Sequence, residues 1–238
     1  MAKDTRPAEI QLKDGRKLAL KLAVNPRARR ISIRIDAARR EAIATAPSER
    51  QVKRALNFAA ERAGWIEAEL ARLPQGRPFE PGAVIDIRGE PHLLIHEHGR
   101  APPRYEPGKL VVQTTDPALF AARVKRFLMA EARADLEARV AAHARTLGVA
   151  ARRVQVKETR SRWGSCSEDG ALAFSWRVIC APRFVLDYLA AHETAHLREM
   201  NHSRRFWALV AKCTPHWKQG RDWLHHQGFA LHAIGSDA

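Results

Sequence analysis

The sequence predicts an α+β protein with a β-rich first half and a second half in which helices pack on a small sheet. Residues 8–46 and 77–115 contain short alternating apolar runs separated by Gly and Pro, which is typical of strands. A long helix is expected from 116 to about 147, and further helices follow after residue 182. The boundary is expected within residues 110–118, which gives domains 1–115 and 116–238.

In the first half, Asp14-Gly15 predicts a hairpin turn inside "IQLKDGRKLALKLA". The segment "RISIRID" alternates with period two and predicts another strand. Apolar residues then recur at helical spacing from Val52 to Leu70, so one helix is expected there. Ser48 and Gln51 form a candidate capping box at its start.

In the second half, Asp116-Pro117 opens the long helix and Gly148 ends it. The segments "RVQVKETRSRWGSC" and "ALAFSWRVI" predict two strands joined by a turn. Pro182 opens the next helix. One more helix is expected over 201–212, and a last helical stretch ends near Gly228.

Composition restricts the class of protein. No apolar run is long enough for a membrane span, and no secretory signal is recognised at the start. The three cysteines are widely spaced, so we expect reduced thiols in a cytoplasmic protein. The net charge of +15 favours polyanionic partners such as nucleic acid. The basic stretch "NPRARRISIRIDAARR" could follow phosphates, but it lacks interleaved aromatics, so a solvated hairpin face is expected.

The segment "AAHETAHLREMNHSRRFW" concentrates histidines on a predicted apolar helix. His192 and His196 lie four residues apart, so both imidazoles share one helix face and can share one zinc ion. Glu193 is expected beside the metal, where it can take a proton from a metal-bound water. Packed histidines without a metal are the alternative, but burying these polar groups unpaired would be costly.

A catalytic zinc needs a third protein ligand, and His202 is the best candidate. The spacing matches that of metzincins, but Glu199 occupies the position of their glycine and no methionine turn follows. Glu199 is expected on the same helix as His196, where it would be a poor ligand. Tyr188 lies one turn before His192 and is expected to be a packed core residue within reach of the site.

The segment "RSRWGSCSEDGALAFSWRVICAPRFVLDYLAAHETAHLREMNHSRRFW" resembles the YgjP-like zinc metallopeptidase-fold family, relatives of the SprT and Spartan proteases. The "RWGSC" strand and the "NHSxxFW" segment carry the resemblance, which is strong over residues 158–224. It implies a zincin-like domain with an active-site helix on a small sheet. It also implies zinc held by His192, His196 and His202, with Glu193 as the general base.

Three residues before this helix are candidates for substrate binding. Arg160 and Arg162 could stabilise negative charge at the site, and Trp163 could contact the substrate. A surface salt bridge for the arginines and a core position for Trp163 are the alternatives.

These observations favour a zinc-dependent hydrolase, and within that class a metallopeptidase acting on a peptide or protein. Two alternatives stay open. The same metal site could split a nucleoside triphosphate, with Lys157, Arg160 or Arg162 binding phosphates. The chain could instead be a DNA-associated protease, as the resemblance to Spartan suggests. The sequence does not indicate the oligomeric state.

Overall fold

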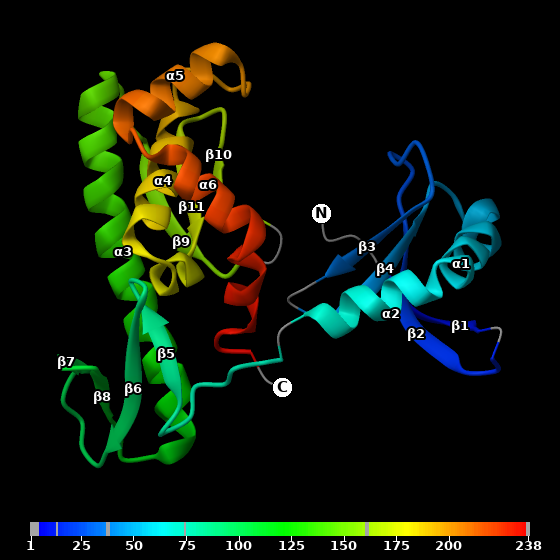
Figure 1. Ribbon diagram of the computed structural model, residues 1–238, viewed down its shortest axis with the longest axis horizontal. Helices are drawn as coiled ribbons and strands as arrows, with labels where there is room; N and C mark the ends of the chain where they lie inside the picture. Colours follow the sequence, from blue (N-terminus) through cyan, green and yellow to red (C-terminus); the bar gives the residue numbers. More distant parts are fainter. Residues whose placement is uncertain (1–4, 13, 37–38, 74, 160–161, 237–238) are drawn as a thin grey trace. The chain divides into compact units, whose positions relative to one another are not determined.

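A computed structural model describes the whole chain except residues 1–4, 13, 37–38, 74, 160–161 and 237–238 (Figure 1). The chain forms two compact units, Met1–Pro74 and Gln75–Ala238. Both units combine helices with small sheets, which confirms the predicted α+β class. No helix in the described part of the chain combines the length and hydropathy that a membrane span needs.

The first unit is a four-stranded sheet with two helices. Its elements are β1 (Thr5–Gln11), β2 (Lys17–Val24), β3 (Ser32–Asp36), β4 (Glu41–Ala46), α1 (Val52–Glu61) and α2 (Ala63–Arg72). The strand order is β1-β2-β4-β3, with β2 and β4 parallel and the other pairs antiparallel. Ala55, Ala59 and Ile66 of the helices pack against apolar side chains of the sheet.

The single helix expected between Val52 and Leu70 is instead two helices. The backbone leaves the helical region at Arg62 (φ −103°, ψ 12°), where α1 ends and α2 begins. The capping box was also wrong. Ser48 is extended and makes no side-chain cap, and a 3-10 turn over Glu49–Gln51 precedes α1.

The second unit contains two further sheets and four α-helices among its described residues. The first sheet holds β5 (Val84–Ile87), β6 (Glu90–Glu97), β7 (Arg104–Glu106) and β8 (Lys109–Gln113). The second holds β9 (Arg153–Lys157), β10 (Gly164–Cys166) and β11 (Ala171–Ser175) in the order β10-β11-β9. The helices are α3 (Phe120–Leu147), α4 (Arg183–Ala195), α5 (Arg204–Cys213) and α6 (Trp217–His226).

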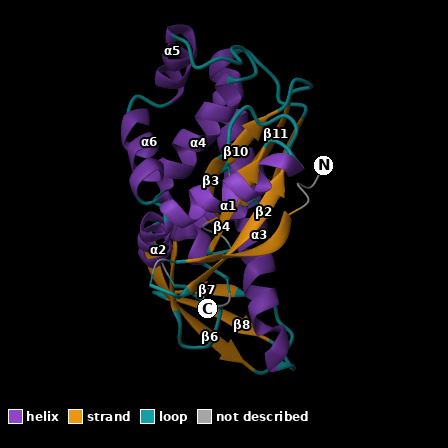
Figure 2. Ribbon diagram, turned by 90° about the vertical axis from the view of Figure 1, so that its right-hand side faces the viewer, coloured by secondary structure: helices purple, strands orange, loops and turns teal. Residues whose placement is uncertain are grey.

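Helix α3 joins the two ends of this unit. Figures 1 and 2 both place β6–β8 at one end of α3 and α4 and α5 towards the other. Asp116 accepts a hydrogen bond from the Ala118 amide before α3, and Gly148 ends α3 in the left-handed conformation (φ 64°, ψ 44°), as expected. Leu128 and Leu136 of α3 lie in one core with side chains of both sheets.

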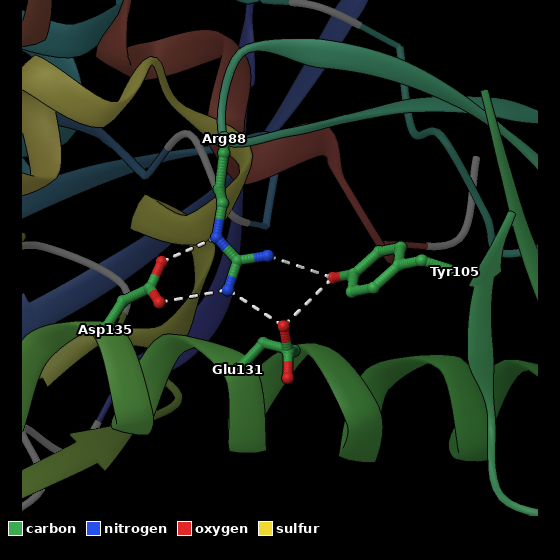
Figure 3. A network of polar contacts seen from close by, with 4 residues as sticks. All are labelled: Arg88, Tyr105, Glu131 and Asp135. Carbon is green, nitrogen blue, oxygen red and sulfur yellow. Dashed lines mark hydrogen bonds and ion pairs between the residues drawn. The ribbon is translucent and has the colours of Figure 1, made fainter. Parts of the chain in front are cut away.

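An ionic network fixes the β5–β6 hairpin to α3 (Figure 3). Arg88 lies in the hairpin turn with φ 56° and donates two hydrogen bonds to Asp135, at 2.7 and 3.0 Å. It donates another to Glu131 at 2.8 Å and one to the Tyr105 hydroxyl at 3.2 Å. Sheet β5–β8 therefore packs with α3, and the units divide after Pro74 instead of within residues 110–118.

Candidate metal centre

The predicted HExxH segment lies at the C-terminal end of α4. This helix packs against α3, α5, α6 and β10. His192 and Glu193 lie in its last turn, and His196 follows Ala195 as the C-cap with helical backbone angles (φ −63°, ψ −20°). The two histidines therefore remain one helical turn apart.

His202 comes to the same place from the loop between α4 and α5. Ser203 caps α5 by accepting a hydrogen bond from the Phe206 amide, so the loop ends directly after His202. The Nε2 atoms of His192 and His202 are 3.0 Å apart. One ring nitrogen from each of His192, His196 and His202 lies within 4.8 Å of the other two. The structure thus brings the three predicted histidines together.

The outer nitrogens of two of these rings have hydrogen-bond partners. His196 Nδ1 lies 3.1 Å from the Glu199 carbonyl oxygen. A carbonyl can only accept, so this Nδ1 carries the proton and leaves Nε2 with a free lone pair. His192 Nδ1 lies 3.2 Å from the Tyr188 hydroxyl. Glu199 itself lies beyond the end of α4, not on it as expected, and its backbone is what contacts the site.

A buried phenylalanine supports all three imidazoles. Phe206 has no exposed surface, and its ring centre lies 4.8 Å from that of His192, 4.5 Å from His196 and 4.7 Å from His202. This contact was not predicted. The sequence contains only a weak signal for it, the four-residue spacing between His202 and Phe206.

Burial keeps two of the histidines, His192 and His196, in the form that binds metals. It lowers the pKa of His192 to about 3, with a further contribution from His196 and His202. Burial also lowers the pKa of His196. Both rings are therefore neutral at physiological pH, and neutral imidazole is the form that donates a lone pair to a metal.

Glu193 is almost completely buried next to a glycine. Burial raises the pKa of its carboxyl group to about 8, while Arg162 acts in the opposite direction. A Cβ atom at Gly164 would lie 2.4 Å from Oε1 of Glu193. Only glycine therefore lets β10 approach this carboxyl so closely, and the sequence alone did not reveal that contact.

The three residues predicted to bind substrate lie in different surroundings. Arg160 lies outside the described residues. Arg162 is exposed, and its charge acts on Glu193. Trp163 packs against the core and stacks on His232, with 4.4 Å between ring centres and an interplanar angle of 25°. Its indole therefore contacts the C-terminal segment.

The donor set fits a single divalent ion. Two nitrogens bound at about 2.1 Å to one tetrahedral ion lie roughly 3.4 Å apart, which is compatible with the spacing of these rings. Imidazole ligands suit zinc, copper, iron and nickel, so the set does not select among these metals. Without an ion, two imidazole nitrogens only 3.0 Å apart share at most one proton between them.

Comparison with known proteins identifies the family of the chain. The YgjP-like metallopeptidase domain matches residues 29–227. No curated protein matches the chain. The crystal structure of the metallopeptidase zymogen abylysin from Pyrococcus abyssi is similar to 39% of this chain and 95% of that chain, with 23% identity and a TM-score of 0.35. The family match spans most of the sequence, including all three histidines and Glu193, and the chain therefore belongs to the YgjP-like metallopeptidase family.

Proposed function

We propose that this protein is a zinc-dependent metallopeptidase in which His192, His196 and His202 hold the ion and Glu193 is the general base. The observation that carries the proposal is that three imidazoles meet at the end of α4, in the helical turn that also carries the buried Glu193. Three neutral nitrogen ligands are typical of catalytic zinc sites, which leave a further position open.

The chemistry divides between the ion and the chain. Zinc, when bound, supplies a Lewis acid that polarises the scissile carbonyl and makes water acidic enough to attack near neutral pH. Burial alone would keep Glu193 protonated near neutral pH, but the positive charge of a bound ion would favour its ionised form. As a carboxylate, Glu193 accepts the proton of the attacking water and delivers it to the leaving amine. The Tyr188 hydroxyl and the Glu199 carbonyl fix the rings of His192 and His196 through their Nδ1 atoms.

Strand β10 supports a peptide as the substrate. It is an edge strand that pairs with β11, and its first residue, Gly164, lies against Glu193. An extended peptide that adds to such an edge gains backbone hydrogen bonds irrespective of its sequence. Pairing along β10 would bring a peptide bond next to the carboxylate that acts as the base.

The three free cysteines, Cys166, Cys180 and Cys213, fit a protein of the reducing cytoplasm.

Nucleotide hydrolysis is the competing activity, because the exposed Arg162 acts on Glu193 and could instead bind a phosphate.

The test measures hydrolysis of unstructured fluorogenic peptides and of nucleoside triphosphates by the zinc-loaded protein. We expect peptide cleavage by the wild type, and a decrease of about 10²- to 10⁴-fold in Glu193→Gln with zinc content unchanged. Glu137→Gln, the same chemical change on the exposed side of α3, serves as the control and keeps full activity. Triphosphate hydrolysis without peptide cleavage, or an active Glu193→Gln variant, would refute the proposal.

A further inference from the structure

A groove in the first unit runs along the edge strand β3, facing α1 and α2. It consists of two adjoining depressions of about 450 and 350 Å³, which share Arg30, Ile31 and Phe58 in their walls. β3 is the last strand of its sheet, and β4 is its partner. The groove lies entirely within the unit Met1–Pro74.

The charge of this groove is strongly positive. Arg29, Arg30, Arg54 and Arg62 are exposed in its walls, and no carboxylate contributes to them. None of the four has an ion pair with an acidic side chain in the described part of the chain.

Two arginines elsewhere in the same unit have acidic partners. Arg16 pairs with Glu67 at 2.8 Å, and Arg72 pairs with Glu69 at 2.8 Å. Four unpaired guanidinium groups in one groove repel one another, so an anionic ligand would relieve an unfavourable interaction there.

Two aromatic side chains lie between these arginines. Trp65 of α2 is 46% exposed although it is large and apolar. Phe58 of α1 is half-buried, and the guanidinium carbon of Arg62 lies 5.8 Å from the centre of its ring. The basic stretch that leads into β3 has no aromatics of its own. The fold supplies them from α1 and α2, which lie outside this stretch of the sequence.

We infer that this groove binds single-stranded nucleic acid. Guanidinium groups bind phosphates through paired hydrogen bonds, and exposed aromatic rings stack on unpaired bases. A duplex keeps its bases stacked inside, so it could use the arginines but not Trp65. An acidic peptide could also use the arginines, but it has no planar base to cover the indole. The combination of cations and an exposed indole therefore favours single strands.

This inference does not depend on the proposed peptidase activity. Every groove residue belongs to the first unit, whereas the histidines belong to the second. A His192→Ala variant should therefore lose the metal and keep the binding of nucleic acid.

The test is fluorescence anisotropy of labelled oligothymidylate and oligouridylate, about 15 nucleotides long, with the full chain. If the four arginines each neutralise one phosphate, log K falls against log salt with a slope of about −3. Trp65→Ala should weaken binding by about tenfold, because it removes one stacking platform. Arg30→Gln/Arg54→Gln should reduce the slope by about 1.4.

Arg16→Gln/Arg72→Gln is the matched control, because it removes the same charge from arginines that are already paired. It should leave the affinity and the salt slope close to those of the wild type. The inference is overturned if neither oligonucleotide binds near physiological salt. It is also overturned if the control weakens binding as much as the groove variants, or if duplex DNA or an acidic peptide of equal charge binds as tightly.

Discussion

At the scale of single residues, Gly164 determines how close β10 can come to Glu193. A methyl group there would lie 2.4 Å from Oε1 and 2.7 Å from Cδ of the carboxyl group. Neither distance is compatible with van der Waals contact, so the carboxyl or the strand must move. The position of the proposed base therefore depends on a residue that has no side chain.

We predict that Gly164→Ala lowers kcat for peptide cleavage by roughly a hundredfold, as displacements of about 1 Å at a catalytic group do. The three histidines are not affected, so the variant should bind zinc like the wild type. Gly64→Ala is the control, because a Cβ atom there meets nothing within 4 Å. Wild-type activity in Gly164→Ala would show that Glu193 does not need this contact.

Sequence spacing predicted which histidines meet, but not what surrounds them. His192 and His196 follow from helix geometry, and His202 from its position directly before a new helix. The supporting contacts of Phe206 and Gly164 arise from tertiary packing between elements, which no local pattern encodes. Polar contacts to His192 and His196 come from a tyrosine hydroxyl and a backbone carbonyl, and only the first is visible in the sequence.

At the scale of elements, Glu158 links β9 to α3 and to the segment after β11. It accepts hydrogen bonds from Trp176 at 2.9 Å and from Arg177, and it pairs with Lys125 at 2.6 Å. Partial burial alone would raise the pKa of Glu158, but these three donors outweigh it and lower the pKa to about 2. The carboxylate thus stabilises the fold in its charged form.

The sign of the pH dependence follows from this shift. The pKa in the folded protein lies below its ordinary value, so the stabilisation is complete above about pH 4.5 and disappears as the pH falls towards 2. We predict that Glu158→Gln lowers Tm at pH 7 and that the difference from wild type narrows steadily below pH 4.5. Glu168→Gln, in the exposed β10–β11 turn, is the comparison. A Tm difference that does not change with pH would contradict this role.

Element boundaries were predictable where a residue fixes the backbone locally. Gly148 ended the long helix as expected, because the left-handed conformation favours glycine. The break at Arg62 has no such local signal, since arginine is a good helix former. The apolar pattern continues across the break, because α1 and α2 both pack on the same core.

At the scale of the whole molecule, one sheet topology occurs twice. The sheets β1-β2-β4-β3 and β5-β6-β8-β7 have the same strand order and the same sequence of antiparallel, parallel and antiparallel pairs. No internal repeat in the sequence corresponds to this repeated sheet topology. The two sheets differ in the helices that pack on them. Sheet β5–β8 packs on α3, and the two share a hydrophobic core that also includes side chains of α4, the helix that carries His192.

This difference explains why the expected boundary at 110–118 does not separate compact units. Leu94 and Leu110 of the second sheet share a core with Phe120 and Val124 of α3. We predict that a fragment of residues 75–238 folds cooperatively and binds zinc. A fragment of residues 116–238 loses these contacts, so we expect it neither to fold cooperatively nor to bind zinc. Equal stability of the two fragments in thermal unfolding would favour the later boundary.

The zinc content of the purified full chain shows whether His192, His196 and His202 together hold one ion. Mass spectrometry of metals should find about one zinc per chain after reconstitution and dialysis. His202→Ala should fall well below that value, while His98→Ala, outside the cluster, should match the wild type. A wild-type protein that retains no zinc, or a His202→Ala variant that retains as much as the wild type, would be incompatible with a zinc site built from these three histidines.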